Sequence, residues 1–427
     1  MATAPGKLNT FIVSDVHLNT QPYDAEAEPE NPNRRHFREF ITQLIRLHKP
    51  GERTILVLNG DILDITGSWF DAPLPWDNHT DRVQKILLKI LEQIASNNAH
   101  VFAEMRHFLS LAGTEIHYIF GNHDRLLGLY PIAQQFLRDV IGGPDAGGSV
   151  ALYFKTELLI PELNLYAEHG QRFDPFNFEH DPTTPPFGEI INILIINRFL
   201  GNVLKALREA GYSEAVVEDV KQVLDDLEYL RPLSLGPYWL QNVLHRYDKH
   251  PENKGKPASI GEVITRTAMA LAFDRKLTHI VAKRLRIPRP ILINVLRFFL
   301  RFPGLLPVLS YIVTRLQYRT HYNRYQQKMA RQINASRGYH LLVFGHTHIP
   351  ELLALNERTY YFNTGCWKPV IHLFKPPKGQ PPLLEYLFSE TPFNKIQRCG
   401  IFKAEKDLTR PELPARFEIA TMQQGVG

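Results

Sequence analysis

The chain has 427 residues, of which 44% are hydrophobic and 22% are charged, and this composition is typical of a globular protein with material for about two or three domains. Its two cysteines, Cys366 and Cys399, argue against a disulfide framework and leave no CxxC metal motif. The first residues, MATAPGKLNT, lack the apolar core of a signal peptide, so we expect a cytoplasmic protein.

Strand-like and helix-like segments alternate in the first part of the chain. Apolar runs at 9–16, 54–60 and 115–120 predict buried strands. Helical spacing of apolar residues predicts helices at 35–47, 81–94 and 99–111. Two more strand-like runs between residues 150 and 169 are split by Pro161. This alternation predicts the α/β class.

A helical segment interrupts the alternation. After the Pro-rich break DPTTPPFGE, helices are predicted at 190–209, 213–230, 260–283, 290–300 and 305–333. Strands resume at 340–344, 350–355 and 359–363, and a last strand, LLEYLF, is expected before the tail frays. We therefore predict an α/β domain formed by residues 1–180 and 339–427, with a helical insertion at 181–338.

Side chains that can bind metals follow five of the predicted strands. They are Asp15, His17, Asp61, Asn122, His169, His346 and His348. The ends of strands are where layered sheets build their sites, and ligands of this kind fit two divalent cations. Each residue taken alone has an ordinary alternative: Asp61 can cap a helix, and a solitary buried His169 is most often a satisfied core residue.

In chain order these residues form the pattern D-x-H … G-D … G-N-H-D … H … G-H-x-H, which resembles the calcineurin-like metallophosphoesterase superfamily over residues 9–180 and 338–375. The resemblance implies a layered (αββα) sandwich of two sheets with a large helical insertion. It also implies two metal sites with one shared ligand. One site comprises Asp15, His17, Asp61 and His348, and the other comprises Asp61, Asn122, His169 and His346.

The same resemblance implies a mechanism. Two bridged cations activate a water and polarise the phosphoryl oxygens, and the centre stays positive enough to attract an anionic phosphate. Oxygen ligands beside imidazoles favour Mn²⁺, with Fe, Zn or Co as alternatives. His123 is expected to face the substrate, where it stabilises charge or protonates the leaving oxygen. Asp124 either orients that imidazole or caps the turn.

The loop HGQRFDPFN contains further polar residues near the predicted site. Gln171, Arg172 and Asp174 either touch substrate and ordered waters or fix the loop, with Asp174-Pro175 as a turn. Of these, Arg172 is the candidate for substrate binding. Asn363, in the Asn-Thr-Gly stretch after the last histidines, is expected to help close the sheet near the site.

A basic block runs from Arg275 to Arg331, with 13 Lys and Arg and no Asp or Glu, inside a chain whose net charge is +5. Residues 291–313 are long and apolar enough to span a bilayer, but Arg and Pro interrupt them, and a central Arg is costly there. A helix lying on an anionic membrane surface fits better. The alternatives are a helical cap on the α/β domain, and a nucleic-acid surface, which so apolar a stretch disfavours.

These observations predict a hydrolase of phosphate esters or pyrophosphate bonds, acting on a lipid-linked or membrane-associated substrate at the inner membrane face. UDP-2,3-diacylglucosamine pyrophosphatases resemble the chain in their D-x-H-L motif and in a helical insertion before the last histidines. They often have Arg at the position of His123, and their insertion is shorter. The alternatives are a soluble phosphodiesterase or phosphatase acting on nucleotides or phosphoproteins, a nuclease, and a non-catalytic metal-binding scaffold. The sequence does not distinguish a monoester from a diester, or a monomer from an oligomer.

Overall fold

The computed structural model describes residues 6–20, 32–70, 73–76, 80–143, 150–230, 236–285, 287–301, 324–373 and 393–425. The chain divides into two compact units, each treated by itself below. The first, the α/β unit, comprises Met1–Glu189, Asn323–Pro369 and Gln397–Val426. The second, the helical unit, comprises Ile190–Tyr322, Val370–Ile396 and Gly427.

The first sheet has seven strands in the order β10-β11-β1-β2-β3-β4, with β12 paired to β11. The strands are β1 (Lys7–Val13), β2 (Arg53–Asn59), β3 (Thr114–Ile119), β4 (Leu152–Lys155), β10 (Gly365–Leu373), β11 (Phe393–Asp407) and β12 (Arg416–Gly425). The strands β1 to β4 are parallel, and β11 runs antiparallel to β1. In this register Ile12 is the partner of Val57, and Val57 is the partner of His117, so the carboxyl ends of β1, β2 and β3 are aligned.

The second sheet has five strands in the order β5-β6-β7-β9-β8. They are β5 (Glu157–Ile160), β6 (Leu165–Glu168), β7 (Leu341–Phe344), β8 (Glu351–Ala354) and β9 (Tyr360–Asn363). The three central strands, β6, β7 and β9, are parallel, and the outer two are antiparallel to their neighbours. One hydrophobic core contains Ile12 and Val57 of the first sheet together with Leu165 and Val343 of the second. The two sheets therefore pack face to face.

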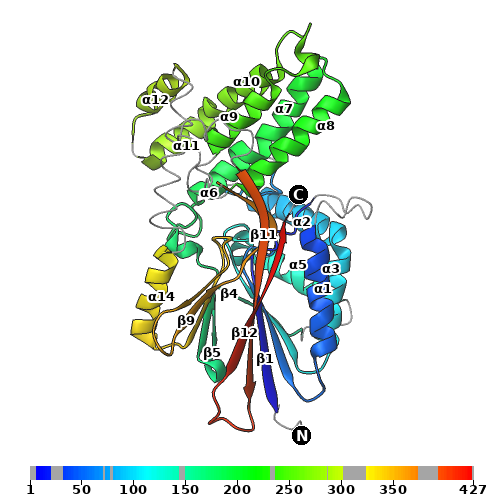
Figure 1. The fold of residues 1–427 in the computed structure, drawn as a ribbon, viewed down its shortest axis with the longest axis vertical. Coiled ribbons are helices and arrows are strands. Elements are labelled where there is room, and N and C mark those ends of the chain that lie inside the picture. Colours follow the sequence, from blue (N-terminus) through cyan, green and yellow to red (C-terminus); the bar gives the residue numbers. More distant parts are fainter. Residues whose placement is uncertain are drawn as a thin grey trace, which may run out of the picture. The chain divides into compact units, whose positions relative to one another are not determined.

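Helices cover the outer faces of this pair of sheets (Figure 1). Beside the first sheet lie α1 (Pro32–Leu47), α2 (Thr80–Asn97), α3 (Ala99–Ser110) and α5 (Pro131–Gly142), with the short α4 (Leu126–Leu129) between β3 and α5. On the second sheet, α14 (Arg324–Arg337) buries Ala330 against Tyr166, Leu342 and Phe344. The predicted α/β class is confirmed, with two mixed sheets.

The helical unit has its own core. Its helices are α7 (Asn197–Glu209), α8 (Glu214–Asp225), α9 (Gly236–Tyr247), α10 (Ile260–Ala272), α11 (Arg275–Leu285) and α12 (Arg289–Arg301), preceded by α6 (Phe187–Ile191) and a π-helical turn, Asn192–Ile196. Buried side chains of α7 to α10 form one cluster that includes Val203, Val220, Trp239 and Ile264. Among the described residues, Phe187–Glu209 alone is long and apolar enough to cross a membrane, judged by length and composition.

Several elements differ from the sequence prediction. The helix expected at 260–283 is two helices, α10 and α11, separated at Phe273 and Asp274. The helix α14 belongs to the α/β unit, because its apolar side packs on the second sheet, whereas the sequence predicts this segment to lie in the insertion. The tail contains two long strands, β11 and β12, that we did not predict. The strand expected for LLEYLF and residues 302–313 lie outside the described residues.

Candidate metal centre

The seven predicted metal ligands follow the carboxyl ends of parallel strands from both sheets. Asp15 and His17 follow β1, Asp61 follows β2, and Asn122 follows β3. In the second sheet, His169 follows β6, and His346 and His348 follow β7. Because the two sheets pack face to face, these strand ends meet. Hydrogen bonds join the segments: the Asp15 amide donates to Gly60, and the Gly345 amide donates to His169, at N···O distances of 3.0 and 2.9 Å.

The first cluster of donors, cluster one, comprises Asp15, His17, Asp61 and His348. All four side chains are buried, and their ligand atoms lie within 4.8 Å of one another. The Nε2 atom of His348 lies 3.2 Å from Asp15 Oδ1 and 3.3 Å from His17 Nε2. Nitrogen and oxygen donors converging in this way suit a divalent cation.

The second cluster, cluster two, shares Asp61 with the first. The ligand atoms of Asp61, His169 and His346 lie within 4.8 Å of one another. His169 Nε2 lies 3.2 Å from Asp61 Oδ2, and His346 Nδ1 lies 2.8 Å from Asn122 Oδ1. The structure thus brings all seven predicted residues together as two groups that could each hold a metal ion. Asn122 and His346 are the partly exposed members, so this cluster is the more open to solvent.

Buried donor atoms without hydrogen-bond partners mark the same place. Asp15 Oδ1 is fully buried and lacks a hydrogen-bond partner among the described residues, and the buried His169 Nε2 faces the Asp61 carboxylate at 3.2 Å. Leaving such a group unsatisfied costs about 1–3 kcal/mol. The opposite edge of each group is held firmly: Asp15 Oδ2 accepts from the His346 amide at 3.1 Å, and His169 Nδ1 lies 2.7 Å from the Asn59 carbonyl oxygen. The atoms that face the centre of each cluster are therefore the ones that a cation could bind.

The backbone at this site is strained. Five of the six described non-glycine residues with positive φ are candidate ligands: Asp15 (56°), His17 (55°), Asp61 (54°), His346 (73°) and His348 (61°). A left-handed conformation costs an L-residue about 1–2 kcal/mol. Strain of this kind persists where the surrounding structure enforces it, and it gathers at functional sites. The strained residues are thus a sign of function that does not depend on any motif.

Two glycines let the strand ends approach. A methyl group on Gly345 would overlap Ser14 Oγ and lie 2.7 Å from Asp15 Oδ2. A methyl group on Gly121 would overlap Asp61 Oδ1 and lie 2.5 Å from the Asp61 backbone nitrogen. Both positions immediately precede a candidate ligand, so the glycines of the GNHD and GHTH motifs are required by close packing of the ligand side chains.

The charged side chains of the two clusters shift one another's pKa values. Burial opposes ionisation of Asp61, but the imidazoles of His169 and His123 hold its pKa well below the usual range. Burial also opposes protonation of His169, yet the Asp61 and Asp15 carboxylates raise its pKa to about 10. Burial raises the pKa of Asp15 and lowers that of His17. Buried carboxylates of this kind need positive charge beside them, which a dication would supply.

The orienting role predicted for Asp124 is not supported. Its buried carboxylate accepts from the Ile62 amide at 3.0 Å, the Gly121 amide at 2.6 Å and the Tyr118 hydroxyl at 2.6 Å. Asp124 therefore ties the turn after β3 to the turn after β2, which is the turn-capping alternative. Tyr118 is the donor that sequence reasoning did not foresee.

The ring of His123 is held instead by Asp64. Asp64 Oδ1 lies 2.7 Å from His123 Nδ1, and Thr66 Oγ1 lies 3.1 Å from the same nitrogen. The ring stands edge-on to that of His17, with centroids 4.6 Å apart, so it is beside cluster one. Lys368, which is 8% exposed, places its ammonium 3.3 Å from Asp64 Oδ2.

Substrate binding by Arg172 is also not supported by the geometry. Its Nε donates to Glu168 at 2.6 Å, and its guanidinium lies 4.0 Å from Glu157 and 4.8 Å from the centre of the Phe173 ring. Glu168 precedes His169, and neighbouring side chains on a strand face opposite ways. Arg172 thus serves the outer side of the second sheet, as the loop-fixing alternative requires. Gln171 also fixes the loop, by donating to the Phe120 carbonyl at 3.0 Å.

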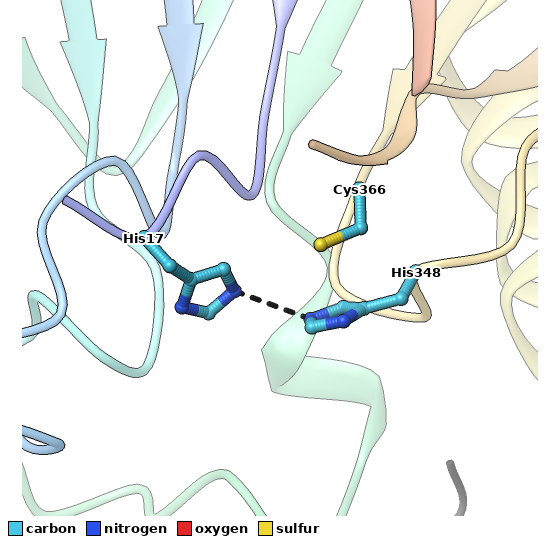
Figure 2. Close-up of side chains that lie close together, drawn as sticks. All are labelled: His17, His348 and Cys366. Carbon is cyan, nitrogen blue, oxygen red and sulfur yellow. Dashed lines mark hydrogen bonds between the residues drawn. The ribbon is translucent and has the colours of Figure 1, made fainter. Parts of the chain in front are cut away.

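Besides Tyr118, the sequence prediction missed three residues at the site: Asp64, Lys368 and Cys366. Asp64 lies three residues after Asp61, in the same turn after β2, and this proximity in sequence could have indicated it. Cys366 lies beside His17 and His348, as Figure 2 shows, and follows the Asn363-Thr364-Gly365 stretch. The Asn363 side chain donates to the Gly345 carbonyl at 2.7 Å, so that stretch does help to hold the GHTH turn.

Replacing Asp174 by Asn is expected to weaken metal binding by about 10–100-fold, because carboxylates that hold a ligand histidine contribute that much to affinity. Asp174 Oδ2 lies 3.0 Å from His346 Nε2, opposite the nitrogen that faces Asn122. Competition with a chelating dye measures the affinity. Asp181→Asn, which alters an exposed carboxylate that caps its own loop, is the control. Equal affinities of the two variants would contradict this role of Asp174.

Comparison of the chain with protein-family models and with curated proteins finds no match. The resemblance to the calcineurin-like superfamily therefore rests on the motif pattern.

Proposed function

We propose that the chain is a dinuclear metal-dependent hydrolase of phosphate esters or pyrophosphate bonds, with the two-sheet architecture of the metallophosphoesterases. The observation that carries the proposal is the pair of buried donor clusters that share Asp61. Two divalent cations held by these residues would supply an activated water and polarise phosphoryl oxygens at neutral pH. A paired arrangement suits in-line displacement at phosphorus, because the attacking and leaving oxygens are both stabilised.

The chain's own residues contribute positioning and proton transfer. Asp61 fixes the two clusters relative to each other, and Asn122 contributes a neutral oxygen that adds no negative charge against the incoming phosphate. With Nδ1 of His123 held by Asp64, Nε2 is the ring atom that would meet the leaving oxygen and protonate it. The side chain of His123 is 19% exposed, in contrast to the buried Asp64, so a substrate can reach it.

Replacing His123 by Asn is expected to lower kcat by about 10²-fold, the low end for loss of a general acid. The metal content of clusters one and two should stay unchanged, because His123 belongs to neither of them. The measurement is Mn²⁺- or Zn²⁺-supported hydrolysis of an aryl and an alkyl phosphodiester. The loss should be larger for the alkyl ester, whose leaving oxygen needs the proton more.

The matched control for this experiment is His117→Asn in β3, the strand that precedes the GNHD motif. The ring of His117 bonds Glu115 at 3.0 Å and packs against Tyr153. Its loss should leave kcat unchanged. Equal losses of His123→Asn on both esters would rule out proton donation. Normal metal binding without hydrolysis of either ester by the wild type would favour the non-catalytic scaffold.

We further propose that the helical unit brings the enzyme to an anionic membrane surface, where a lipid-linked substrate is found. Three large apolar side chains of α12 are about half exposed: Ile291 (52%), Val295 (45%) and Phe298 (52%). Their spacing of four and three residues places them on one helix face. They belong to the block that lacks acidic residues, and Lys283 and Arg297 are also exposed. Apolar side chains flanked by cations fit the interface of an anionic bilayer.

The double change Ile291→Glu and Val295→Glu is expected to weaken binding to phosphatidylglycerol vesicles by about 10-fold or more, from lost burial and added repulsion. Cosedimentation at low and high salt measures the binding. Leu352→Glu, at an exposed site on β8 of the α/β unit, is the control. If the wild type hydrolyses small esters but does not bind these vesicles, the result would support a soluble phosphodiesterase instead.

A further inference from the structure

Cluster one has a sulfur atom beside it. Cys366, the second residue of β10, is fully buried, and its Sγ lies within 4.8 Å of the ligand nitrogens of His17 and His348. Figure 2 shows the thiol directed into the space between the two rings. The Sγ atom also lies 3.3 Å from the backbone carbonyl oxygen of Asp15, a contact in which the thiol is the donor. The thiol thus lies beside two candidate ligands, His17 and His348, and the backbone of a third, Asp15.

A second observation points to a ligand at this place. The Asp15 Oδ1 atom is fully buried and has no hydrogen-bond partner among the described residues, while it lies 3.2 Å from His348 Nε2. Zinc bonds of about 2.0 Å to nitrogen and 2.3 Å to sulfur keep two donors on one ion within about 4.3 Å of each other. The sulfur and the two imidazoles lie within 4.8 Å of one another, and the carboxylates of Asp15 and Asp61 form a group with the same two imidazoles. Binding of one ion by both groups therefore requires the thiol to move inward.

The backbone fixes Cys366 in this position. The next residue, Trp367, donates its amide to the Asp15 carbonyl at 3.1 Å, and its ring packs on Phe37 of α1, with centroids 5.4 Å apart. The thiol is therefore tied to the segment that carries Asp15 and His17. Cluster two differs, because among the described residues its donors are nitrogen and oxygen atoms only.

We infer that Cys366 is a thiolate ligand of cluster one, which makes this site selective for a borderline-soft dication such as Zn²⁺ over Mn²⁺. The inference rests on the proposed metal centre and refines it into two unlike sites. When the ion binds, the S–H bond breaks, a sulfur–metal bond forms, and the proton leaves to solvent. Thiolate donors favour zinc, whereas the oxygen-rich cluster two suits a harder ion such as Mn²⁺.

Cobalt is the probe that tests this assignment, because thiolate ligation gives Co²⁺ a sulfur-to-metal charge-transfer band in the near ultraviolet. The chelator-treated full chain is titrated with Co²⁺ under reducing, oxygen-free conditions. The wild type and Cys399→Ser should show this band together with visible d–d bands. Cys366→Ser should keep the d–d bands and lose the charge-transfer band. Its Zn²⁺ affinity should fall by at least about 10-fold with little change for Mn²⁺.

Two outcomes would overturn the assignment in distinguishable ways. Visible d–d bands without a charge-transfer band in the wild type would leave the metal centre intact and exclude the thiolate. The absence of any cobalt spectrum would overturn the metal centre itself. X-ray absorption of the zinc-loaded wild type tests the assignment without relying on the folding of any variant. A Zn–S distance of about 2.3 Å would support the thiolate ligand, and scattering from nitrogen and oxygen alone would contradict it.

Discussion

Replacing Asp61 by Asn is expected to lower metal-supported hydrolysis of bis-p-nitrophenyl phosphate by at least about 10³-fold, since Lewis-acid stabilisation is worth several kcal/mol. Among the described residues, Asp61 is the one that belongs to both cluster one and cluster two. An amide removes the charge that offsets two cations, and its NH₂ group cannot serve as a second donor. The loss should therefore affect both sites at once.

Metal content and activity of Asp61→Asn are measured on the same preparation, by elemental analysis after dialysis and by phosphodiester hydrolysis. Asp139→Asn, at an exposed position on α5 in the same unit, makes the same change of charge and should behave as the wild type. Two ions retained with full activity would show that Asp61 is a structural carboxylate, and the shared-ligand proposal would fail.

Replacing Gly121 by Ala is expected to lower the same activity by about 10³-fold. The added methyl group would overlap Asp61 Oδ1 and meet the Asp61 backbone nitrogen at 2.5 Å, and a backbone atom cannot swing aside. Displacement of a site by about 1 Å can cost 10²-fold in rate, and weakened ligation adds about 10-fold or more. Because this substitution leaves every candidate ligand side chain unaltered, its effect on activity reports the position of Asp61 and not a change of charge.

Gly201→Ala is the matched control for Gly121→Ala. Gly201 lies inside α7, and a methyl group there would meet nothing within 4 Å. It should raise the free energy of unfolding by about 0.5–1 kcal/mol, because alanine is the better helix former, and leave activity unchanged. Thermal unfolding with and without Mn²⁺ separates a loss of metal from a loss of fold. Full metal-dependent stabilisation of Gly121→Ala would contradict the packing argument.

The candidate ligands were predictable because the carboxyl ends of adjacent parallel strands must meet. The apolar runs before Asp15, Asp61 and Asn122 identified three such strands, and the register of β1, β2 and β3 aligns their ends. What the sequence could not provide was contact between residues far apart. Asp64 and His123 are 59 residues apart, and Cys366 lies 351 residues from the Asp15 carbonyl that it meets.

Local rules explain the remaining differences. Asp124 and Arg172 lie two and three residues after a candidate ligand. The Asp124 side chain enters the turn and accepts from Tyr118, whereas Arg172 lies on the opposite sheet face and pairs with Glu168. The strands β11 and β12 were missed because their apolar residues alternate with Lys, Glu and Gln. One face of such a strand is solvated, and the pattern resembles a mixed tail.

The placement of β7 far down the chain also bears on how the protein is made. The second sheet is interrupted after β6, and about 170 residues must be synthesised before β7 can pair with it, which takes roughly 10–30 s at ribosomal rates. During that interval the edge of β6 is an unpaired strand edge, the kind of surface that recruits other chains. Pairing of β6 with its distant partner therefore removes this exposed edge late in synthesis, and the candidate metal ligands after β7 arrive last.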